Sequence, residues 1–279
     1  NSLITNNDIH DFGLNSWPYT YGIDISGCGS TVSHNDIYNS KTRAIYWSDA
    51  YHTIEYNDVH DVLTASDDIG AISTDHRVRV GNVIRYNYIH NIGCVGALAE
   101  IDKINPDYKY LGSAAIYGDF GGSYWEAYGN VIEHVNGNGF QAGGRNITMR
   151  GNLIIDCTNW YVWIIAMQYD DAYKYNKSYT YSVPDYVYSD VWKEANPDLA
   201  SLKLDLRNVP SDDPLGWAMP VGNVVQNNWI HYNRGERVTN PWGTAPYYIY
   251  DEVYMFSSDT IDTNRQRFND NMSVYNSRR

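Results

Sequence analysis

Short apolar runs separated by polar turn residues recur along the chain, and each run carries an asparagine at the same place. Residues 3–11 read "LITNNDIHD", residues 31–39 "TVSHNDIYN", residues 53–61 "TIEYNDVHD" and residues 83–91 "VIRYNYIHN". The asparagine follows an apolar residue and one or two polar residues, and another apolar residue stands two places after it. An amphipathic helix would need apolar residues at i, i+3 and i+4 over ten or more positions, so this alternation predicts short β-strands.

The spacing of the asparagine predicts how the strands are arranged. The repeated asparagines are Asn7, Asn35, Asn57, Asn87, Asn130, Asn152 and Asn228. The intervals between them are 28, 22, 30, 43, 22 and 76 residues. The shortest interval, 22 residues, is a repeat length typical of a solenoid. Because the units are strands, we predict an all-β fold, a right-handed parallel β-helix whose shortest coils have 22 residues.

The repeated asparagine has a physical role in such a fold. Asparagine amides on coils about 4.8 Å apart can hydrogen-bond to one another as a ladder. Asparagine also tolerates the left-handed backbone of a sharp turn, and the flanking isoleucines and valines would fill the interior. Histidines follow the ladder by three positions at His10, His60, His90 and His231. This regularity favours ring stacking or turn bonding over contact with a substrate.

Intervals longer than 22 residues predict loops inserted between strands, and such loops usually form the binding surface of a solenoid. The longest insertion is Tyr-rich and covers residues 167–206. Its part "DVWKEANPDLASLKL" predicts one or two short helices with a break at Pro197. The pattern fades over residues 233–279, which we expect to form an irregular tail or cap. No linker divides residues 1–279, so we predict one domain. The chain opens inside the repeat, and we therefore expect a longer protein with further N-terminal coils.

Composition and charge limit the classes of partner that the protein can bind. The formal net charge is −13 and charged residues make up 19% of the 279 residues. A negative surface repels phosphate backbones, so nucleic acid is an unfavourable partner, as are anionic membranes and strongly acidic polysaccharides. No run of 18 apolar residues occurs, which excludes a membrane-spanning helix. Polysaccharide-acting enzymes and adhesins use the parallel β-helix, so we expect an extracellular or cell-surface protein that acts on an oligo- or polysaccharide, with the periplasm as the alternative location.

Two segments depart from the repeat and carry candidate chemistry: "ASDDIGAIS" and "GSAAIYGDFGGSYWEAYGN". Ile72 lies 15 residues before one ladder asparagine and Ile116 lies 14 before the next, so they should occupy matching points on consecutive coils. Asp68 precedes the first isoleucine and Asp119 follows the second, and we expect both to flank one groove. Two carboxylates a few ångströms apart are the minimum machinery for cleaving a glycosidic bond. Asp67 and Asp75 compete with Asp68 for the first role, and Asp75 follows Ile72 by three residues just as Asp119 follows Ile116.

Four residues are candidates for binding a sugar. They are Asp75 itself, His76 beside it, Trp125, and Arg145 in the turn "GGRN". An aromatic face can stack on a sugar ring. Arginine can bind a sugar hydroxyl, although bonding turn carbonyls is as plausible a role. We predict no cofactor and no transition-metal site, and acidic ladders could hold Ca²⁺.

The order of "TASDDIGAIS", "AAIYGDFGGSYWEAYGNVI", "GNGFQAGGRNITMRGN" and "WKEANPDLASL" resembles the right-handed β-helix glycoside hydrolases that include α-L-fucosidases and xylanases. The resemblance runs from about Ala44 to Leu202. It implies a glycoside hydrolase whose catalytic pair is Asp68 and Asp119. The chain departs from that family at Ser73, where an aromatic residue is usual, and at Phe120, where a second aspartate is common.

Three functions follow from this reading, in descending order. The first is a glycoside hydrolase of plant- or microbial-type polysaccharide. The second is a non-catalytic carbohydrate-binding, adhesive or structural surface β-helix, in which the two aspartates would point apart. The third is a polysaccharide lyase, which needs a basic or Ca²⁺-lined groove to neutralise a uronate. The chain has 20 Lys+Arg against 33 Asp+Glu and no basic cluster, which disfavours the lyase.

Overall fold

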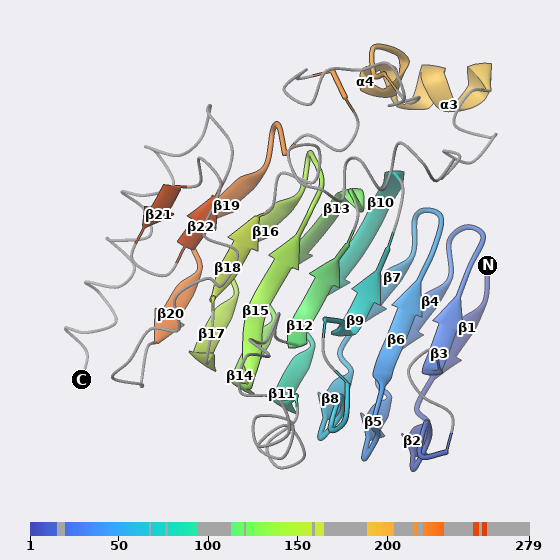
Figure 1. The fold of residues 1–279 in the computed structure, drawn as a ribbon. Helices are drawn as coiled ribbons and strands as arrows, with labels where there is room; N and C mark the ends of the chain where they lie inside the picture. The colour runs from blue at the N-terminus through green and yellow to red at the C-terminus, as the bar shows by residue number, and fades with distance from the viewer. Residues whose placement is uncertain are drawn as a thin grey trace.

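The strands of the protein wind into a parallel β-helix, as the asparagine spacing predicts (Figure 1). The computed structural model describes residues 1–15, 20–66, 68–75, 78–93, 113–119, 121–157, 160–164, 189–203, 215–216, 220–231, 248–250 and 253–255. Each coil as far as β18 contributes one strand to each of three sheets, and the strands of successive coils pair in parallel. The C-terminal β21–β22 pair, which ends the third sheet, is antiparallel.

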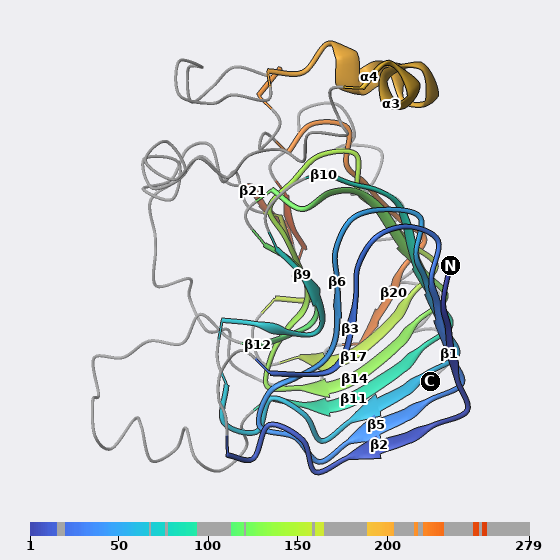
Figure 2. The same cartoon turned by 90° about the vertical axis from the view of Figure 1, so that its right-hand side faces the viewer.

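From β1 to β20 the three sheets take strands in strict rotation along the chain. Sheet A contains β1 (Leu3–Thr5), β4 (Thr31–Ser33), β7 (Thr53–Glu55), β10 (Val78–Arg85), β13 (Ser123–Tyr128), β16 (Thr148–Arg150) and β19 (Val224–Gln226). Sheet B contains β2 (Asp8–His10), β5 (Asp36–Tyr38), β8 (Asp58–His60), β11 (Tyr88–Ile92), β14 (Val131–Val135), β17 (Leu153–Cys157) and β20 (Trp229–His231). Sheet C contains β3 (Tyr21–Ile25), β6 (Arg43–Trp47), β9 (Gly70–Thr74), β12 (Ser113–Gly118), β15 (Gly137–Ala142), β18 (Val162–Ile164), β22 (Val253–Met255) and β21 (Tyr248–Tyr250). Figure 2 shows the strands of sheet B lying one behind the next along the coil stack.

The repeated asparagines form the predicted ladder at the bend between sheets A and B. Asn57 Nδ2 donates to Asn87 Oδ1 at 3.0 Å, and Asn87 Nδ2 donates to Asn130 Oδ1 at 3.0 Å. The left-handed backbone belongs to the residue before each asparagine, as at Tyr56 (φ 54°) and Tyr86 (φ 56°), and not to the ladder residue. The bend is therefore made by two residues, one that turns the chain and one that bonds the coils.

Aliphatic side chains from equivalent points of successive coils fill the interior. One column from sheet B consists of fully buried residues that are register partners: Ile37, Val59, Ile89, Ile132, Ile154 and Ile230. Burying each such side chain contributes about 1.5–3 kcal/mol relative to leaving it exposed. A one-residue slip would turn a whole column outward, so the core fixes the register of the coils.

The Tyr-rich insertion contains the two short helices that were predicted around Pro197. Helix α3 (Asp190–Ala195) begins with Ser189 Oγ accepting from Trp192 N, and α4 (Pro197–Ala200) starts at the proline. Proline is well suited to the first position of a helix because its missing N–H would have no helical partner there. Strand β22 pairs with β18 and so extends sheet C, while the rest of residues 233–279 lies outside the described chain apart from β21. In the part of the chain that the structure describes, neither helix has the length and apolarity of a bilayer-crossing segment.

Candidate functional site

Strands β9 and β12 bring the two candidate segments side by side. Ile72 and Ile116 are direct register partners, which confirms that they occupy matching points on consecutive coils. The same register sets Gly118 beside Thr74, and Asp119 N donates to Thr74 O at 2.9 Å. Asp119 therefore follows β12 at the level where Asp75 follows β9, whereas Asp68 lies at the opposite end of β9.

The phenol of Tyr117 joins Asp68 and Asp119. Tyr117 is 4% exposed and its Oη donates to Asp68 Oδ1 at 3.1 Å. The pKa of Tyr117 is raised well above its ordinary value by burial, by the charges of Asp119 and Asp68, and by hydrogen bonds to both carboxylates. Although the two aspartates are 51 residues apart in sequence, they meet at one hydroxyl group.

Local backbone geometry allows both carboxyl groups to reach the hydroxyl of Tyr117. Asp68 adopts a left-handed conformation, with φ of 56°, which turns the exposed carboxylate back over the adjacent coil. Asp tolerates this conformation better than most residues. At the other end, Gly122 N donates to Asp119 O at 2.9 Å and closes a tight turn. Trp125 Nε1 donates to Gly122 O at 3.0 Å, so a buried side chain fixes the turn that carries half-buried Asp119.

Asp75 belongs to a second cluster on the neighbouring strands. The hydroxyl of Tyr46 donates to Asp75 Oδ1, and Arg79 Nη2 lies 3.8 Å from the same oxygen. Burial, followed by the charge of Asp75 and the hydrogen bond to it, raises the pKa of Tyr46. Burial and the charge of Asp75 also raise the pKa of Asp24. Asp75 is thus adjacent to Asp119, as the spacing predicted, but its carboxylate already has an internal phenol and cation.

Tyr46 and Tyr117 belong to one line of residues across sheet C, which we call the polar row. Its members are successive register partners: Asp24, Tyr46, Ser73, Tyr117, Gln141 and Trp163. Side chains at register positions of parallel strands project to the same side of a sheet. Ser73 is 1% exposed, and its Oγ has no hydrogen-bond partner among the described residues. A short polar side chain therefore separates the two acid-bound tyrosines.

Two of the predicted substrate-binding side chains, Trp125 and Arg145, lie in the interior of the structure. Trp125 is 2% exposed and packs edge-on against Trp47 with ring centroids 6.1 Å apart, so neither face is open to a sugar ring. Arg145 is 8% exposed and its Nη1 donates to Gly216 O at 3.2 Å, which is the turn-bonding alternative. Burial lowers the pKa of Arg145. His76 lies outside the described residues.

Comparison with known proteins assigns the family. A model of the right handed beta helix region matches residues 21–173. The chain belongs to the right-handed β-helix family. None of the curated proteins and none of the solved structures matched it. The matched region of this β-helix protein includes Asp68, Tyr117 and Asp119. The family supports several unrelated activities, so function has to be argued from the site.

Sequence reasoning missed the tyrosines of the β-helix protein's site. Tyr46 and Tyr117 each follow an aligned isoleucine, in "AIYW" and "AIYG", and Ser73 takes the same place in "GAIS". Had the alignment of Ile72 with Ile116 been extended by one residue, it would have placed all three on one line. The signal was weak because tyrosine is also an ordinary strand residue.

Proposed function

We propose that this β-helix protein hydrolyses a glycosidic bond of an oligo- or polysaccharide, with Asp68 and Asp119 as its catalytic pair. The observation that carries the proposal is the shared contact of both carboxyl groups with Tyr117 Oη. Glycoside hydrolysis needs one carboxyl group that gives a proton and another that is ionised. A phenol has a single proton and can donate it to one carboxylate only. Hydrogen bonds to both carboxyl groups are satisfied when the second one carries a proton.

The surroundings suggest how the roles divide. Asp119 is half-buried and Asp68 is exposed. Burial disfavours the charged form of a carboxyl group, whereas contact with water favours it. We therefore assign Asp119 as the acid that donates a proton to the leaving oxygen. Asp68 takes the ionised role, as nucleophile or base. Tyr117 is a positioning residue that holds the two groups at a set separation.

That separation favours one stereochemical outcome. Two oxygens that bond to the same hydroxyl lie about 4.5–5.5 Å apart, given ordinary hydrogen-bond lengths and angles. Retaining glycosidases hold their carboxyl groups about 5–5.5 Å apart, and inverting enzymes about 6.5–9.5 Å apart. The proposed enzyme should retain the anomeric configuration, and proton NMR of the first product formed would show this.

A hydrolysis screen tests the proposal. Wild type would be incubated with a panel of neutral plant and microbial polysaccharides, beside Asp119→Asn, Asp68→Asn and the control Asp8→Asn. Asp8 is an exposed aspartate of β2 in sheet B, so its substitution tests for a general effect of lost charge. We expect at least one glycan to be cleaved, and both site variants to lose about 10³-fold or more in kcat while Asp8→Asn stays near wild type. Equal rates in wild type and both site variants would refute the assignment.

Carbohydrate binding without catalysis is the second candidate, and the polar row supports it. Tyr46 of that row is only half-buried, and aromatic side chains can bind sugars without cleaving them. Glycan binding with no turnover in the screen would favour this candidate. A lyase has less support, because Arg79 beside the acids has only 3% of its side chain exposed and pairs with Asp75 and Asp49, and so is poorly placed to act as a base.

A further inference from the structure

The outer face of sheet B carries a column of stacked rings beside a column of carboxylates. The rings are register partners, with centroids 5.1 Å apart for His10–Tyr38, 5.0 Å for Tyr38–His60 and 4.8 Å for His60–His90. This confirms stacking at three of the four repeated histidines; the side chain of the fourth is not described. The carboxylates stand two residues earlier on the same strands, at Asp8, Asp36 and Asp58.

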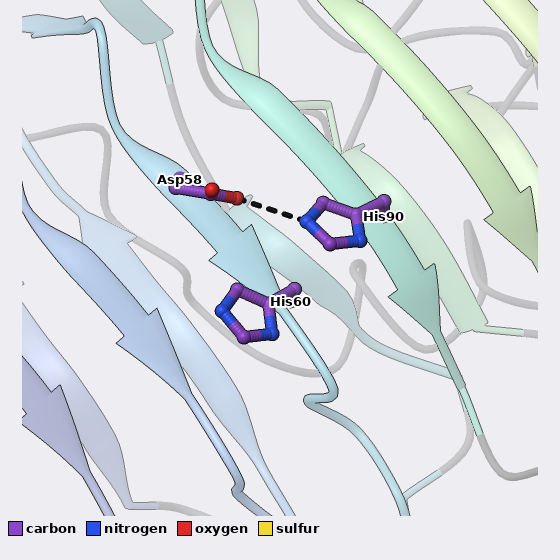
Figure 3. Close-up of side chains that lie close together, drawn as sticks. All are labelled: Asp58, His60 and His90. Carbon is purple, nitrogen blue, oxygen red and sulfur yellow. Dashed lines mark hydrogen bonds and ion pairs between the residues drawn. The ribbon is translucent and has the colours of Figure 1, made fainter.

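Three side chains of these columns converge at β8 and β11. His90 Nε2 lies 3.0 Å from Asp58 Oδ1, and His60 extends from the same strand as Asp58 (Figure 3). One ligand atom from each of Asp58, His60 and His90 lies within 4.8 Å of the other two. Strand β8 contributes a D-x-H pair and the adjacent coil contributes the histidine directly across, so the register of sheet B builds the cluster.

We propose that Asp58, His60 and His90 bind one divalent transition-metal ion such as Zn²⁺ on the outer face of sheet B. Two imidazoles and one carboxylate form a ligand set that Zn²⁺ accepts, whereas Ca²⁺ prefers oxygen ligands alone. Two ligand atoms bound to one ion at about 2.0–2.1 Å in a tetrahedral site lie about 3.3 Å apart. His90 Nε2 and Asp58 Oδ1, 3.0 Å apart, need to separate only slightly, and the ion would replace the proton they now share.

The surroundings of His60 prepare its ring for this role. Its Nδ1 lies 2.7 Å from Asp61 Oδ2, so Asp61 can accept the Nδ1 proton of His60 when Nε2 binds the ion. A carboxylate behind the ring in this way is the usual outer-shell partner of a metal-bound histidine. The Nε2 of His60 also lies 3.1 Å from Asp36 Oδ1, and this nitrogen would exchange that contact for the ion. The side chains of His60 and His90 are 21% and 18% exposed, which leaves the cluster open to an ion from solvent.

Metal binding must break the ring stack. The rings of His60 and His90 are inclined by only 13°, and an imidazole lone pair lies in the plane of its ring. Two nearly parallel rings cannot both direct that lone pair at one ion between them. At least one ring has to turn about its Cβ–Cγ bond, so binding should change the NMR signals of both rings together.

Zinc titration of the full chain tests the proposal. Isothermal titration calorimetry with ZnCl₂ at about pH 7.5, above the ordinary pKa of histidine, should show one equivalent bound with a Kd on the order of micromolar. His90→Gln and Asp58→Asn should each weaken binding at least tenfold. Two-dimensional NMR of the histidine rings should show His60 and His90 shifting at one equivalent of zinc, which reports on the site without any substitution.

Matched variants exclude other zinc ligands. His134→Gln removes an exposed histidine that also lies near carboxylates, with Nε2 3.9 Å from Asp156 Oδ2, and Cys28→Ser removes an exposed thiol. Both should keep the zinc affinity within twofold of wild type. Binding that is absent, that disappears in either control, or that is unchanged in His90→Gln and Asp58→Asn would overturn the proposal. None of these outcomes depends on whether the protein hydrolyses a glycan.

Discussion

Tyr117 and Asp68 are 49 residues apart in sequence, yet the Oη of one lies 3.1 Å from the Oδ1 of the other. They meet because β12 stacks directly on β9 and because Asp68 turns back at a left-handed residue. Asp119, two residues after Tyr117, reaches the same hydroxyl. A solenoid thus assembles a local acid pair from two turns that are distant in the chain, and the buried phenol between them sets its geometry.

Tyr117→Phe should impair turnover more than folding. The ionised carboxylate would lose a hydrogen-bond donor, so its pKa would rise and the acidic limb of the pH–rate profile would move to higher pH. We expect kcat to fall about 10- to 100-fold, since the two carboxyl groups lose their common positioning contact. The stability change should be about 1 kcal/mol, as for one hydrogen bond. The checks are the pH dependence of kcat and urea unfolding.

Tyr128→Phe is the matched control for that substitution. Its hydroxyl accepts from Arg85 Nη1 at 2.8 Å on sheet A, away from the aspartate pair. The control should leave the pH–rate profile in place. A Tyr117→Phe enzyme with an unshifted profile and a wild-type kcat would show that the phenol does not position the pair.

Asn87→Ala should destabilise the coil stack strongly. Asn87 Nδ2 donates to Asn130 Oδ1 and to Ile54 O, both at 3.0 Å, and its Oδ1 accepts from Asn57. Truncation leaves buried donors and acceptors without partners, which costs about 2–4 kcal/mol for this set. Asn7 is exposed at the end of the same ladder, so Asn7→Ala should cost less than about 1 kcal/mol. Equal losses of unfolding free energy in urea would contradict the ladder's stabilising role.

The buried ring of His52 should make the protein less stable in mild acid. Ser30 N donates to its Nδ1 at 3.1 Å, and its Nε2 donates to Ser48 O at 2.7 Å, so the folded state holds the neutral ring. Burial lowers the pKa of His52 below its ordinary value of 6.5. The unfolded chain therefore takes up a proton first as pH falls below about 6.5, and unfolding becomes more favourable until the folded ring also protonates.

Urea unfolding across that range measures this linkage. The unfolding free energy of wild type should fall between about pH 7 and pH 5, and His52→Gln should show a shallower fall. The variant is expected to be less stable at neutral pH because glutamine cannot reproduce both hydrogen bonds. Parallel pH dependences for the two proteins would mean that His52 does not titrate with unfolding.

Much of the architecture could be predicted because the constraints are periodic. The spacing of the asparagines gives the length of each coil, and the isoleucines near them give the register between coils. Ile72 could therefore be aligned with Ile116 from the sequence alone. Strand parity would also have indicated that Trp125 faces inward, because Ser123, Trp125 and Ala127 alternate with more exposed residues. The prediction of a sugar contact weighed the aromatic chemistry of Trp125 without its place in that alternation.

The remaining features depend on side-chain reach and could not be read from spacing. The contact between Tyr117 and Asp68 requires a left-handed turn at one aspartate, and nothing in "SDDIG" distinguishes Asp67 from Asp68 in that respect. Arg145 had two equally plausible partners, a sugar or a turn carbonyl. Only the position of Gly216, 71 residues later in the chain, decides between them.

The kinetics of the double variant Asp68→Asn/Asp119→Asn test the central claim most directly. If the two carboxyl groups form one catalytic unit, removing the second after the first costs little more, because effects of residues that act together are not additive. On the glycan that wild type cleaves, kcat of the double variant should lie within about threefold of the slower single variant. Losses that multiply, with all three variants folded as wild type by circular dichroism, would contradict the account.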